Sequence, residues 1–323
     1  MALLNKRVSL LAKVEGTYGT DATPGAADGF WGVAGSAPSL VKQDNNLDNV
    51  ARGGVLSKMQ PAAPGPRHWK VSCQIPLRGA GAAYSTSVKP KISALMRACG
   101  FQETVTATPG VEKVEYKPRS TGFESISFYY YLDGLLYKLL GARGSVNFVL
   151  KAGGLCMAEF ALEGLYADPT DASIVFPTGE PTTLPAPTFL SSAFQIGSEN
   201  YAAAIESINV DMKNTLFAAP DSTKADGVGG IYLLDRNPDG SFNPEAALAA
   251  TFNFYSKWKA QTLQDMSFQV GADQYNRVKF SVPEAALTDI QPQDRSGLAA
   301  FQIPFKAVSS SANGDDEVVV TFD

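Results

Sequence analysis

The sequence predicts an all-β, mainly antiparallel fold with short helices. Segments that alternate apolar and polar residues recur along the chain, and tight-turn dipeptides separate them. The 29 glycines and 20 prolines fit many strands joined by turns. Hydrophobic residues at 45% and charged residues at 18% are typical of a globular protein with a sizeable core. A length of 323 residues allows one large β domain or two of ordinary size.

In the first part of the chain, strands are predicted where apolar and polar residues alternate, and loops where this alternation stops. Residues 8–14 predict a strand, residues 16–29 are a Gly/Thr/Asp/Pro-rich loop, and residues 37–42 are a second candidate strand. Residues 43–66 show no periodicity. Because loops longer than about 15 residues in a compact domain are usually functional or disordered, this loop is a candidate for contact with partners. A strand resumes at residues 69–77.

A short helix is expected at residues 89–99. Pro90 suits the first turn, and Gly100 stands where a left-handed residue ends a helix. The apolar residues fall at i, i+3, i+4 and i+7, which predicts a stripe that packs on a sheet. These residues are Ile92, Leu95, Met96 and Cys99.

Two hairpins are expected between residues 125 and 166. In the first, Asp133-Gly134 joins a strand at 125–132 to its partner at 135–140. In the second, Gly153-Gly154 joins a strand at 144–151 to one that begins near Cys156. Alternation places Tyr129 and Tyr131 on one face and Tyr130 on the other, which suits packing better than a sugar-binding platform.

The second half is expected to repeat the rhythm of the first. A strand at 206–213, a polar loop at 214–227 and a strand at 230–234 precede a helix with Asn243 as its N-cap, running through Phe252. The remaining strands are expected at 266–270, 278–282, 300–308 and 317–322.

This rhythm gives a domain hypothesis. We expect a first β domain at residues 1–167, a proline-rich linker at 168–190 and a second β domain at 191–323 that duplicates the first. Because residue identity between the halves is poor, two unrelated β domains remain the alternative.

Charge and composition exclude several functions. A formal net charge of −5 argues against a protein that grips nucleic acid, since phosphate binding needs a basic surface. No apolar run approaches the roughly 20 residues of a membrane span, and residues 1–11 lack the apolar core of a secretory signal. We therefore expect the protein to be made and kept in a cytoplasm. The widely spaced Cys73, Cys99 and Cys156 are expected to be buried free thiols.

No catalytic constellation is evident, so no catalytic residue, cofactor or metal is assigned. His68 is the only histidine and is expected to be exposed at a strand edge, with no nucleophile elbow to serve. Residues 79–83 lack the third glycine of a dinucleotide fingerprint and are expected to be a loop. The adjacent carboxylates at 315–317 are expected to form a solvated turn.

One segment begins like a calcium loop, and it makes a weak metal candidate. Asp235, Asn237 and Asp239 occupy positions one, three and five, followed by a glycine. Position twelve, which should supply a bidentate carboxylate, is Ala246. A turn that leads into a helix explains the same composition.

Several stretches of the chain resemble the tail tube, or major tail, proteins of long, non-contractile-tailed bacteriophages. Residues 7–14 and the following 15–21 are similar to the amino-terminal segment of that family. The other similar stretches lie at residues 94–101, 116–118, 122–125, 131–134, 141–144 and 160–166. In the second half only the rhythm is similar, so a decorating immunoglobulin-like or sugar-binding domain remains open there.

The resemblance implies a structural virion protein of the β-sandwich or β-barrel kind, and no enzyme. Such proteins form stacked rings whose inner wall is a closed β-barrel, through which the genome passes without specific binding. A duplicated chain would give three chains per ring with pseudo-sixfold symmetry, and a single tube fold would give six. The implied partners are further copies of the chain and the tape-measure, tail-terminator and distal-tail proteins, with assembly in the host cytoplasm and the virion tail as the final location.

The resemblance also implies which residues contact neighbouring subunits and rings. These lie in the amino-terminal segment and in the long loop. The candidates are Arg7, Lys13, Glu15, Tyr18, Asp21, Asp44, Asn45, Asn46, Asp48, Arg52 and Lys58. The competing function class is a β-sandwich carbohydrate-binding module or glycan hydrolase, which would need clustered aromatics near spaced carboxylates.

Overall fold

The computed structural model describes residues 3–35, 37–45, 63–179, 184–190, 194–197, 199 and 201–323. It is mostly antiparallel β structure with short helices, as predicted. The first half holds β1 (Val8–Val14), η1 (Ala26–Asp28), β2 (Gly29–Phe30), β3 (Val33–Ala34), β4 (Ser39–Asn45), β5 (Ala63–Pro76), α1 (Ser93–Ala98), β6 (Phe101–Thr106), β7 (Lys113–Pro118), β8 (Ile126–Leu132), β9 (Leu135–Lys151), β10 (Met157–Leu165) and β11 (Thr170–Asp171).

The second half holds β12 (Gln195–Ile196), β13 (Ile205–Asp211), β14 (Asn214–Pro220), β15 (Val228–Arg236), β16 (Asp239–Pro244), α2 (Phe254–Lys259), β17 (Gln264–Val270), β18 (Val278–Leu287), β19 (Gln291–Arg295), β20 (Leu298–Val308) and β21 (Val319–Phe322). No helix of the described residues is long and apolar enough to cross a membrane.

Six strands of the first half form an antiparallel series in the order β1-β8-β9-β10-β5-β4. The β8–β9 hairpin turns at Asp133 and Gly134, whose φ angles of 42° and 105° are those that this dipeptide tolerates. β9 is long and serves two neighbours, because its first part pairs with β8 and its later part with β10.

Six strands of the second half form a series of the same order, β12-β17-β18-β20-β16-β13, again antiparallel throughout. The two series are joined by hydrogen-bonded strands. β13 pairs with the end of β9, where Asn209 lies opposite Val149, and β21 bridges β18 and β7. The division into domains stays a prediction.

The buried apolar side chains of both halves form one large cluster. Leu95 and Met96 of α1 are fully buried in it, together with Phe148 of β9 and Phe280 of β18. The rings of Phe148 and Phe280 meet edge to face with their centroids 5.1 Å apart, which aromatic pairs favour. A smaller cluster holds Tyr129 and Tyr131, while Tyr130 belongs to the main core, so the predicted alternation is confirmed.

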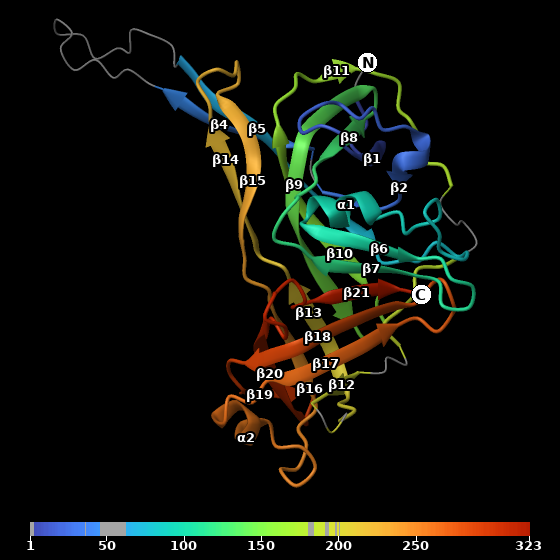
Figure 1. Cartoon of the computed structure of the whole chain (residues 1–323), viewed down its shortest axis with the longest axis vertical. Coiled ribbons are helices and arrows are strands. Elements are labelled where there is room, and N and C mark those ends of the chain that lie inside the picture. Colours follow the sequence, from blue (N-terminus) through green and yellow to red (C-terminus); the bar gives the residue numbers. More distant parts are fainter. Residues whose placement is uncertain are drawn as a thin grey trace, which may run out of the picture.

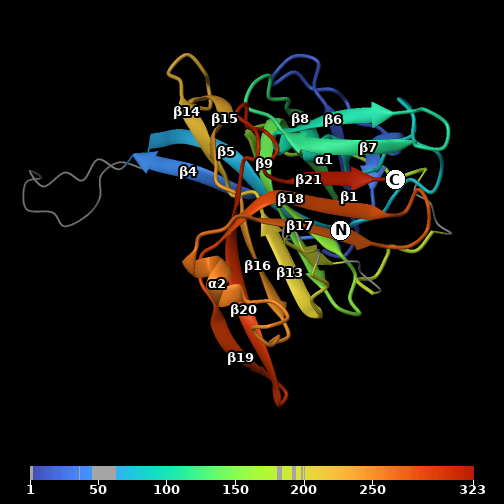
Figure 2. The ribbon, with the colours of Figure 1, turned by 60° about the horizontal axis from the view of Figure 1, so that its bottom comes forward.

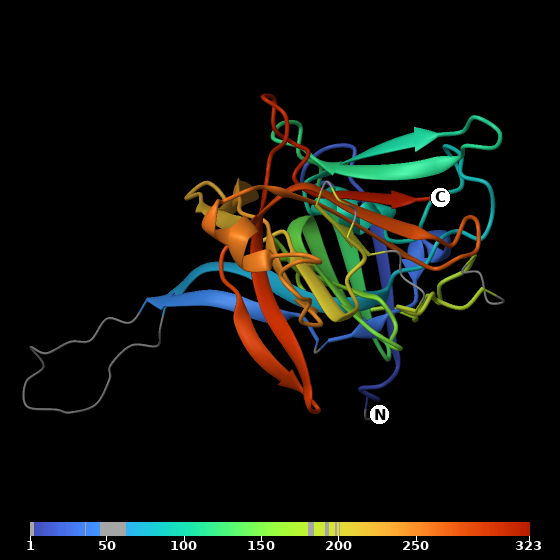
Figure 3. The same ribbon diagram turned by 90° about the horizontal axis from the view of Figure 1, so that it is seen from below.

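Two strand pairs project from this body on the same side (Figure 1). One is β4 with the first part of β5, and the other is the β14–β15 hairpin, which pairs with no other strand of the described residues. Their bases lie beside the sheet formed by β9 and β10. At a third place, the β19–β20 hairpin extends away from the body (Figure 2), in a direction different from that of β4 and β5 (Figure 3).

The structure corrects three expectations about the first half. The described ends of the expected loop at 43–66 are strand, since β4 continues to Asn45 and β5 begins at Ala63. The two strands expected at 135–140 and 144–151 are the single strand β9, because Gly141, at a φ of 58°, lets the chain bend without ending the pairing. The helix begins at Ser93, since the preceding residues form a turn in which the N–H of Ser93 donates to the carbonyl of Pro90.

The expected helix from Asn243 to Phe252 is wrong. Residues up to Pro244 belong to β16, which lies between β13 and β20, so strand pairing overrides the local helix signal. The Asn243 side chain instead accepts hydrogen bonds from the backbone N–H groups of Glu206 and Ser207. The helix of this region is α2, and its N-cap is Asn253, which accepts from the N–H of Ser256.

The polar loop expected at 214–227 is also wrong over its first part, which is β14. This strand lacks a clear alternation because its hairpin stands out from the body, so neither of its faces is fully buried. The predicted strand at 230–234 exists as the longer β15.

Candidate assembly surfaces

Most of the amino-terminal candidates make polar contacts with other parts of the same chain. Glu15 is 8% exposed, and its carboxylate accepts four hydrogen bonds. The donors are the N–H groups of Gly19 (2.8 Å) and Gly141 (2.8 Å) and the hydroxyls of Ser125 (2.7 Å) and Ser127 (2.9 Å). The carboxylate therefore ties the segment after β1 to β8 and β9.

Asp21, another candidate of this segment, also has partners within the chain. The Tyr129 hydroxyl donates to the Asp21 carboxylate at 2.6 and 2.7 Å, and Lys138 lies 3.0 Å from the same carboxylate. Burial opposes ionisation of Asp21, but the hydrogen bonds from Tyr129 and Lys138 outweigh it and lower the pKa of Asp21. Burial, together with the bond to Asp21, raises the pKa of Tyr129 to about 12.

Tyr18, Arg7 and Lys13 are the three remaining candidates of this segment. The Tyr18 hydroxyl accepts from the N–H of Ile231 at 2.6 Å, which attaches the segment to β15. Arg7 pairs with Asp133 at 2.7 Å at the β8–β9 turn. Lys13, whose side chain is 47% exposed, lies 4.0 Å from Asp28, so it is the least committed of the group.

The long-loop candidates divide between described and undescribed positions. Asp44 and Asn45 are the last residues of β4, at the projecting end of that strand. Asn46, Asp48, Arg52 and Lys58 lie outside the described residues.

The two projecting strand pairs are bonded to each other and expose apolar side chains. Arg67 of β5 donates its backbone N–H to the carbonyl of Asp226, and its guanidinium lies 2.6 Å from the Asp226 carboxylate. On the β14–β15 hairpin, Phe217 is 45% exposed, Tyr232 48% and Leu234 62%. We call β4, the first part of β5, β14 and β15 the paired arms.

Sequence reasoning found the second strand of this arm, at 230–234, but missed the first. The apolar stretch at residues 216–219, which precedes the polar turn at 221–227, was the available signal for β14. Periodicity could not show that these apolar side chains face outward.

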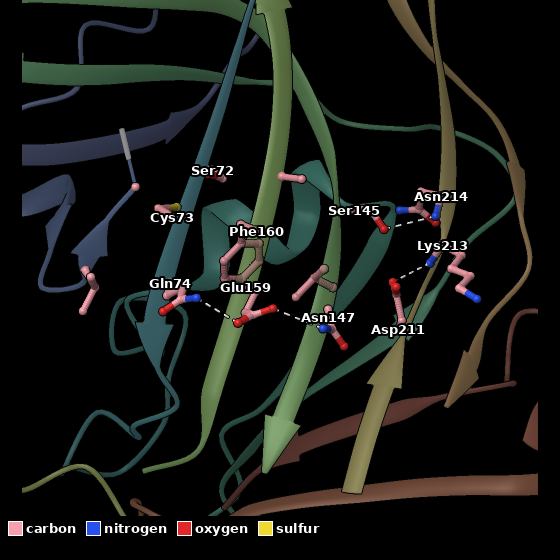
Figure 4. Close-up of a pocket in the computed structure, with 14 residues that line it drawn as sticks. Ser72, Cys73, Gln74, Ser145, Asn147, Glu159, Phe160, Asp211, Lys213 and Asn214 are labelled. Carbon is pink, nitrogen blue, oxygen red and sulfur yellow. Dashed lines mark hydrogen bonds between the residues drawn. The ribbon is translucent and has the colours of Figure 1, made fainter. Parts of the chain in front are cut away.

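A cavity of about 590 Å³ lies on the outer face of the sheet where β5, β10, β9 and β13 meet (Figure 4). Its polar side chains bond to one another. Glu159 accepts from Gln74 at 2.8 Å and from Asn147 at 3.2 Å, and Asn147 accepts from Asn209 at 2.7 Å. Because both oxygens of Glu159 have partners on neighbouring strands, this row stabilises the sheet.

His68 is placed differently from the prediction. It is 8% exposed, and β5 runs between β4 and β10, so His68 is neither exposed nor on an edge strand. Its Nε2 lies 3.3 Å from the Glu163 carboxylate, which Lys70 also approaches to 2.6 Å. Burial opposes ionisation of Glu163, but the bonds from His68 and Lys70 outweigh it and lower the pKa of Glu163.

The carboxylates at 315–317 are not simply solvated, which corrects another expectation. Arg236, at the base of β15, lies 2.9 Å from Asp315 and 3.0 Å from Glu317. Asp315 also accepts from the hydroxyl and the N–H of Ser120. This cluster fixes the second arm to the carboxyl-terminal strand region.

The weak metal candidates are not brought together. Asp239 pairs with Lys213, and Asp235 accepts from the N–H of Arg236, where β15 passes into β16. Within the described residues, no group of three or more His, Cys, Asp or Glu side chains could hold a metal ion. The three cysteines are free and buried, and burial raises the pKa of Cys73 and of Cys156 to about 12.

An all-β body that carries two mutually bonded arms with exposed apolar side chains has the form of a structural protein that associates with other chains. Comparison with known families agrees. The family model described as "Phage tail tube protein" matches residues 5–322, so the chain belongs to the phage tail tube family. No curated protein matches the chain.

Family membership confirms the resemblance seen in the sequence. The chain is a structural component of a bacteriophage tail, and it assembles with itself into the tail tube.

Proposed function

We propose that this chain polymerises into stacked rings and that the resulting tube conducts the phage genome into the host. The observation that carries the proposal is the junction between the two six-strand series. β13 of the second series hydrogen-bonds to β9 of the first, so one series completes the sheet of the other within a single chain. Repetition of such junctions around a ring would remove the strand edges that isolated sheets must protect.

The repeated strand order favours three chains per ring. If each chain supplies two similar units, three chains give six units and pseudo-sixfold symmetry. Six chains per ring is the alternative, and it would follow if only the first series lined the lumen.

The paired arms are the proposed contacts between subunits and between rings. Exposed apolar side chains on a projecting hairpin are a liability for a lone molecule, but they stabilise an assembly that buries them. Residues 43–66 between β4 and β5, with Asp44, Asn45, Asn46, Asp48, Arg52 and Lys58, belong to the same proposed contact. Tape-measure, tail-terminator and distal-tail proteins are the proposed partners at the tube ends, and assembly takes place in the host cytoplasm.

Passage of DNA needs no specific site. A chain with a formal net charge of −5 offers a polyanion little attraction, so the DNA slides without binding. The proposal is tested by concentrating the purified protein for sedimentation and negative-stain imaging. Rings or tubes support it, and a stable monomer at every concentration contradicts it.

A further inference from the structure

The two six-strand series correspond strand by strand, and the correspondence fixes a register. β1, β4, β5, α1, β8, β9 and β10 match β12, β13, β16, α2, β17, β18 and β20 in chain order and in sheet order. β18 ends before the hairpin turn, and β19 continues the same path, since both pair with β20. Together β18 and β19 therefore match the single long strand β9.

The later part of β9 matches β19. Both run into the turn of a hairpin, β9 ending at Lys151 and β19 at Arg295. In this alignment, a row of polar side chains that crosses neighbouring strands of the first series matches a similar row in the second series. Gln74, Glu159 and Asn147 lie opposite one another in the first series, and Gln302 and Gln291 do so in the second, with Asn243 adjoining them on β16.

The outer edges of the matched strands, the later part of β9 and β19, differ: within the described part of the chain, the first pairs with another strand and the second does not. Residues 147–151 of β9 receive β13 on the edge that faces away from β10. The matched five residues of β19 pair only with β20 among the described residues, and the first four of them are exposed. The edge of β19 that faces away from β20 thus lacks the strand that its counterpart has.

β4, the strand that matches β13, also has an outer edge with no neighbouring strand among the described residues. β13 lies beside β16, as β3 and β4 lie beside β5, and β3 and β4 pair with no other strand of the described residues. Val33 of β3 is 61% exposed and Leu40 of β4 is 39% exposed. The chain therefore carries one open edge at β19 and a complementary one at β3 and β4.

We propose that the outer edge of β19 in one copy pairs, antiparallel, with the outer edge of β3 and β4 in the next copy. This junction repeats between chains the β13–β9 junction found within the chain, and it rests on the proposed function. In the internal junction Asp211 lies opposite Asn147 and Ser207 opposite Lys151.

This register transfers through the matched strands β16 and β5, with one adjustment. From Gln74 to Lys70 of β5, four residues apart, the partners Val33 and Ser39 are six residues apart, so two extra residues lie between β3 and β4. The transferred register places Ser39 opposite Gln291 and Val33 opposite Arg295.

Pro292 is compatible with this pairing. It has no N–H, so it removes one donor from the edge of β19. In the transferred register it lies opposite the interval between β3 and β4, where pairing with β5 also changes register, from Val33 opposite Gln74 to Ser39 opposite Lys70. The missing donor thus coincides with an interruption of the ladder.

The junction is tested by cysteine cross-linking in assembled protein. Ser39→Cys combined with Gln291→Cys should give, on mild oxidation, a ladder of disulfide-linked chains that ends at three. The matched control is Leu40→Cys with Gln291→Cys, because adjacent strand residues point to opposite faces. It should link at least tenfold less, as should each single variant. The three native cysteines are buried, so they do not compete.

The outcomes separate this inference from the function on which it rests. Tubes that form normally, but in which the double variant stays unlinked or links no better than its control, overturn the junction and leave the tube proposal standing. Linked dimers from Gln291→Cys alone would show β19 paired with β19 and would overturn it too. If the unsubstituted protein forms neither rings nor tubes, the junction fails together with the proposed function.

Discussion

The amino-terminal segment, a predicted contact with neighbours, and the β14–β15 arm, which was not predicted as one, differ in how far their side chains are satisfied within the chain. Glu15 of the amino-terminal segment is polar and buried, and its carboxylate has partners from its own chain. The β14–β15 arm exposes Phe217, Tyr232 and Leu234, and pairs with no other strand of the described residues. We infer that the first region stabilises the single chain, while the second is completed by other chains.

Glu15→Ala should give the largest loss of stability. The substitution leaves two backbone N–H groups and two serine hydroxyls without their acceptor, and each such group costs roughly 1–3 kcal/mol when buried. We expect a loss of about 3 kcal/mol in the free energy of unfolding, measured by urea denaturation of the unassembled protein. Glu15→Gln, which keeps one acceptor oxygen, should lose less. A loss of under about 1 kcal/mol for Glu15→Ala would show that this segment does not hold the chain together.

Leu234→Asp should leave the stability of the single chain nearly unchanged and should weaken assembly. The side chain is 62% exposed, so the unfolding free energy should change by no more than about 0.5 kcal/mol. Burial of a leucine against a neighbour is worth about 1.5–3 kcal/mol, so the critical concentration for assembly should rise at least tenfold. Sedimentation across a concentration series measures it.

Val111→Asp is the control for this experiment, since Val111 is 61% exposed in the turn between β6 and β7, away from the arms. It should leave assembly unchanged. Equal effects of the two substitutions would argue that the arms have no special role.

Acid should weaken the single chain through a carboxylate near α1. Burial opposes ionisation of Glu103, but hydrogen bonds from Lys89, Ser93 and Tyr116 outweigh it and lower the pKa of Glu103. The folded state then binds fewer protons than the unfolded state. Its stability is therefore complete above the ordinary glutamate pKa of 4.5 and is lost as the pH falls through the lower folded value.

Glu103→Gln tests this point. It should cost about 1–2 kcal/mol at neutral pH, because charge-assisted hydrogen bonds are lost, and it should flatten the fall of stability below pH 4.5. Urea denaturation at a series of pH values measures both. An unchanged pH profile would assign the acid sensitivity to other carboxylates.

The smallest effect is expected from removal of metal ions. Asp239 pairs with Lys213, and Asp235 accepts from a backbone N–H, so the calcium-like loop has no assembled ligand set. A chelator should shift the melting temperature by less than about 1 °C. A larger drop that calcium restores would reinstate the loop as a metal site.

Structural features that depend on neighbouring residues in the sequence were predicted correctly. β1, the Asp133-Gly134 turn, Gly100 after α1 and the alternation of Tyr129 to Tyr131 follow from periodicity and backbone preference. Asn243 misled, because a good N-cap residue serves equally well as an acceptor for the N–H groups of a neighbouring strand.

The assembly surfaces could be predicted only in part, for a physical reason. The amino-terminal and loop candidates came from a family resemblance, which does not say whether a side chain is satisfied by its own chain. Glu15 finds three of its four partners more than 100 residues away in the sequence, and the exposure of Leu234 depends on a hairpin that no periodic pattern marks. Such facts belong to tertiary structure.

The central claim is that neighbouring copies complete one another's sheets to form a hollow tube. A cryo-EM reconstruction of the polymer, with chains traced around one ring, tests it most directly. The account predicts three chains per ring and an inner wall of strands that continue from one copy into the next, with β19 beside β3 and β4. A wall in which each copy closes its own sheet and meets its neighbours only through loops would contradict it.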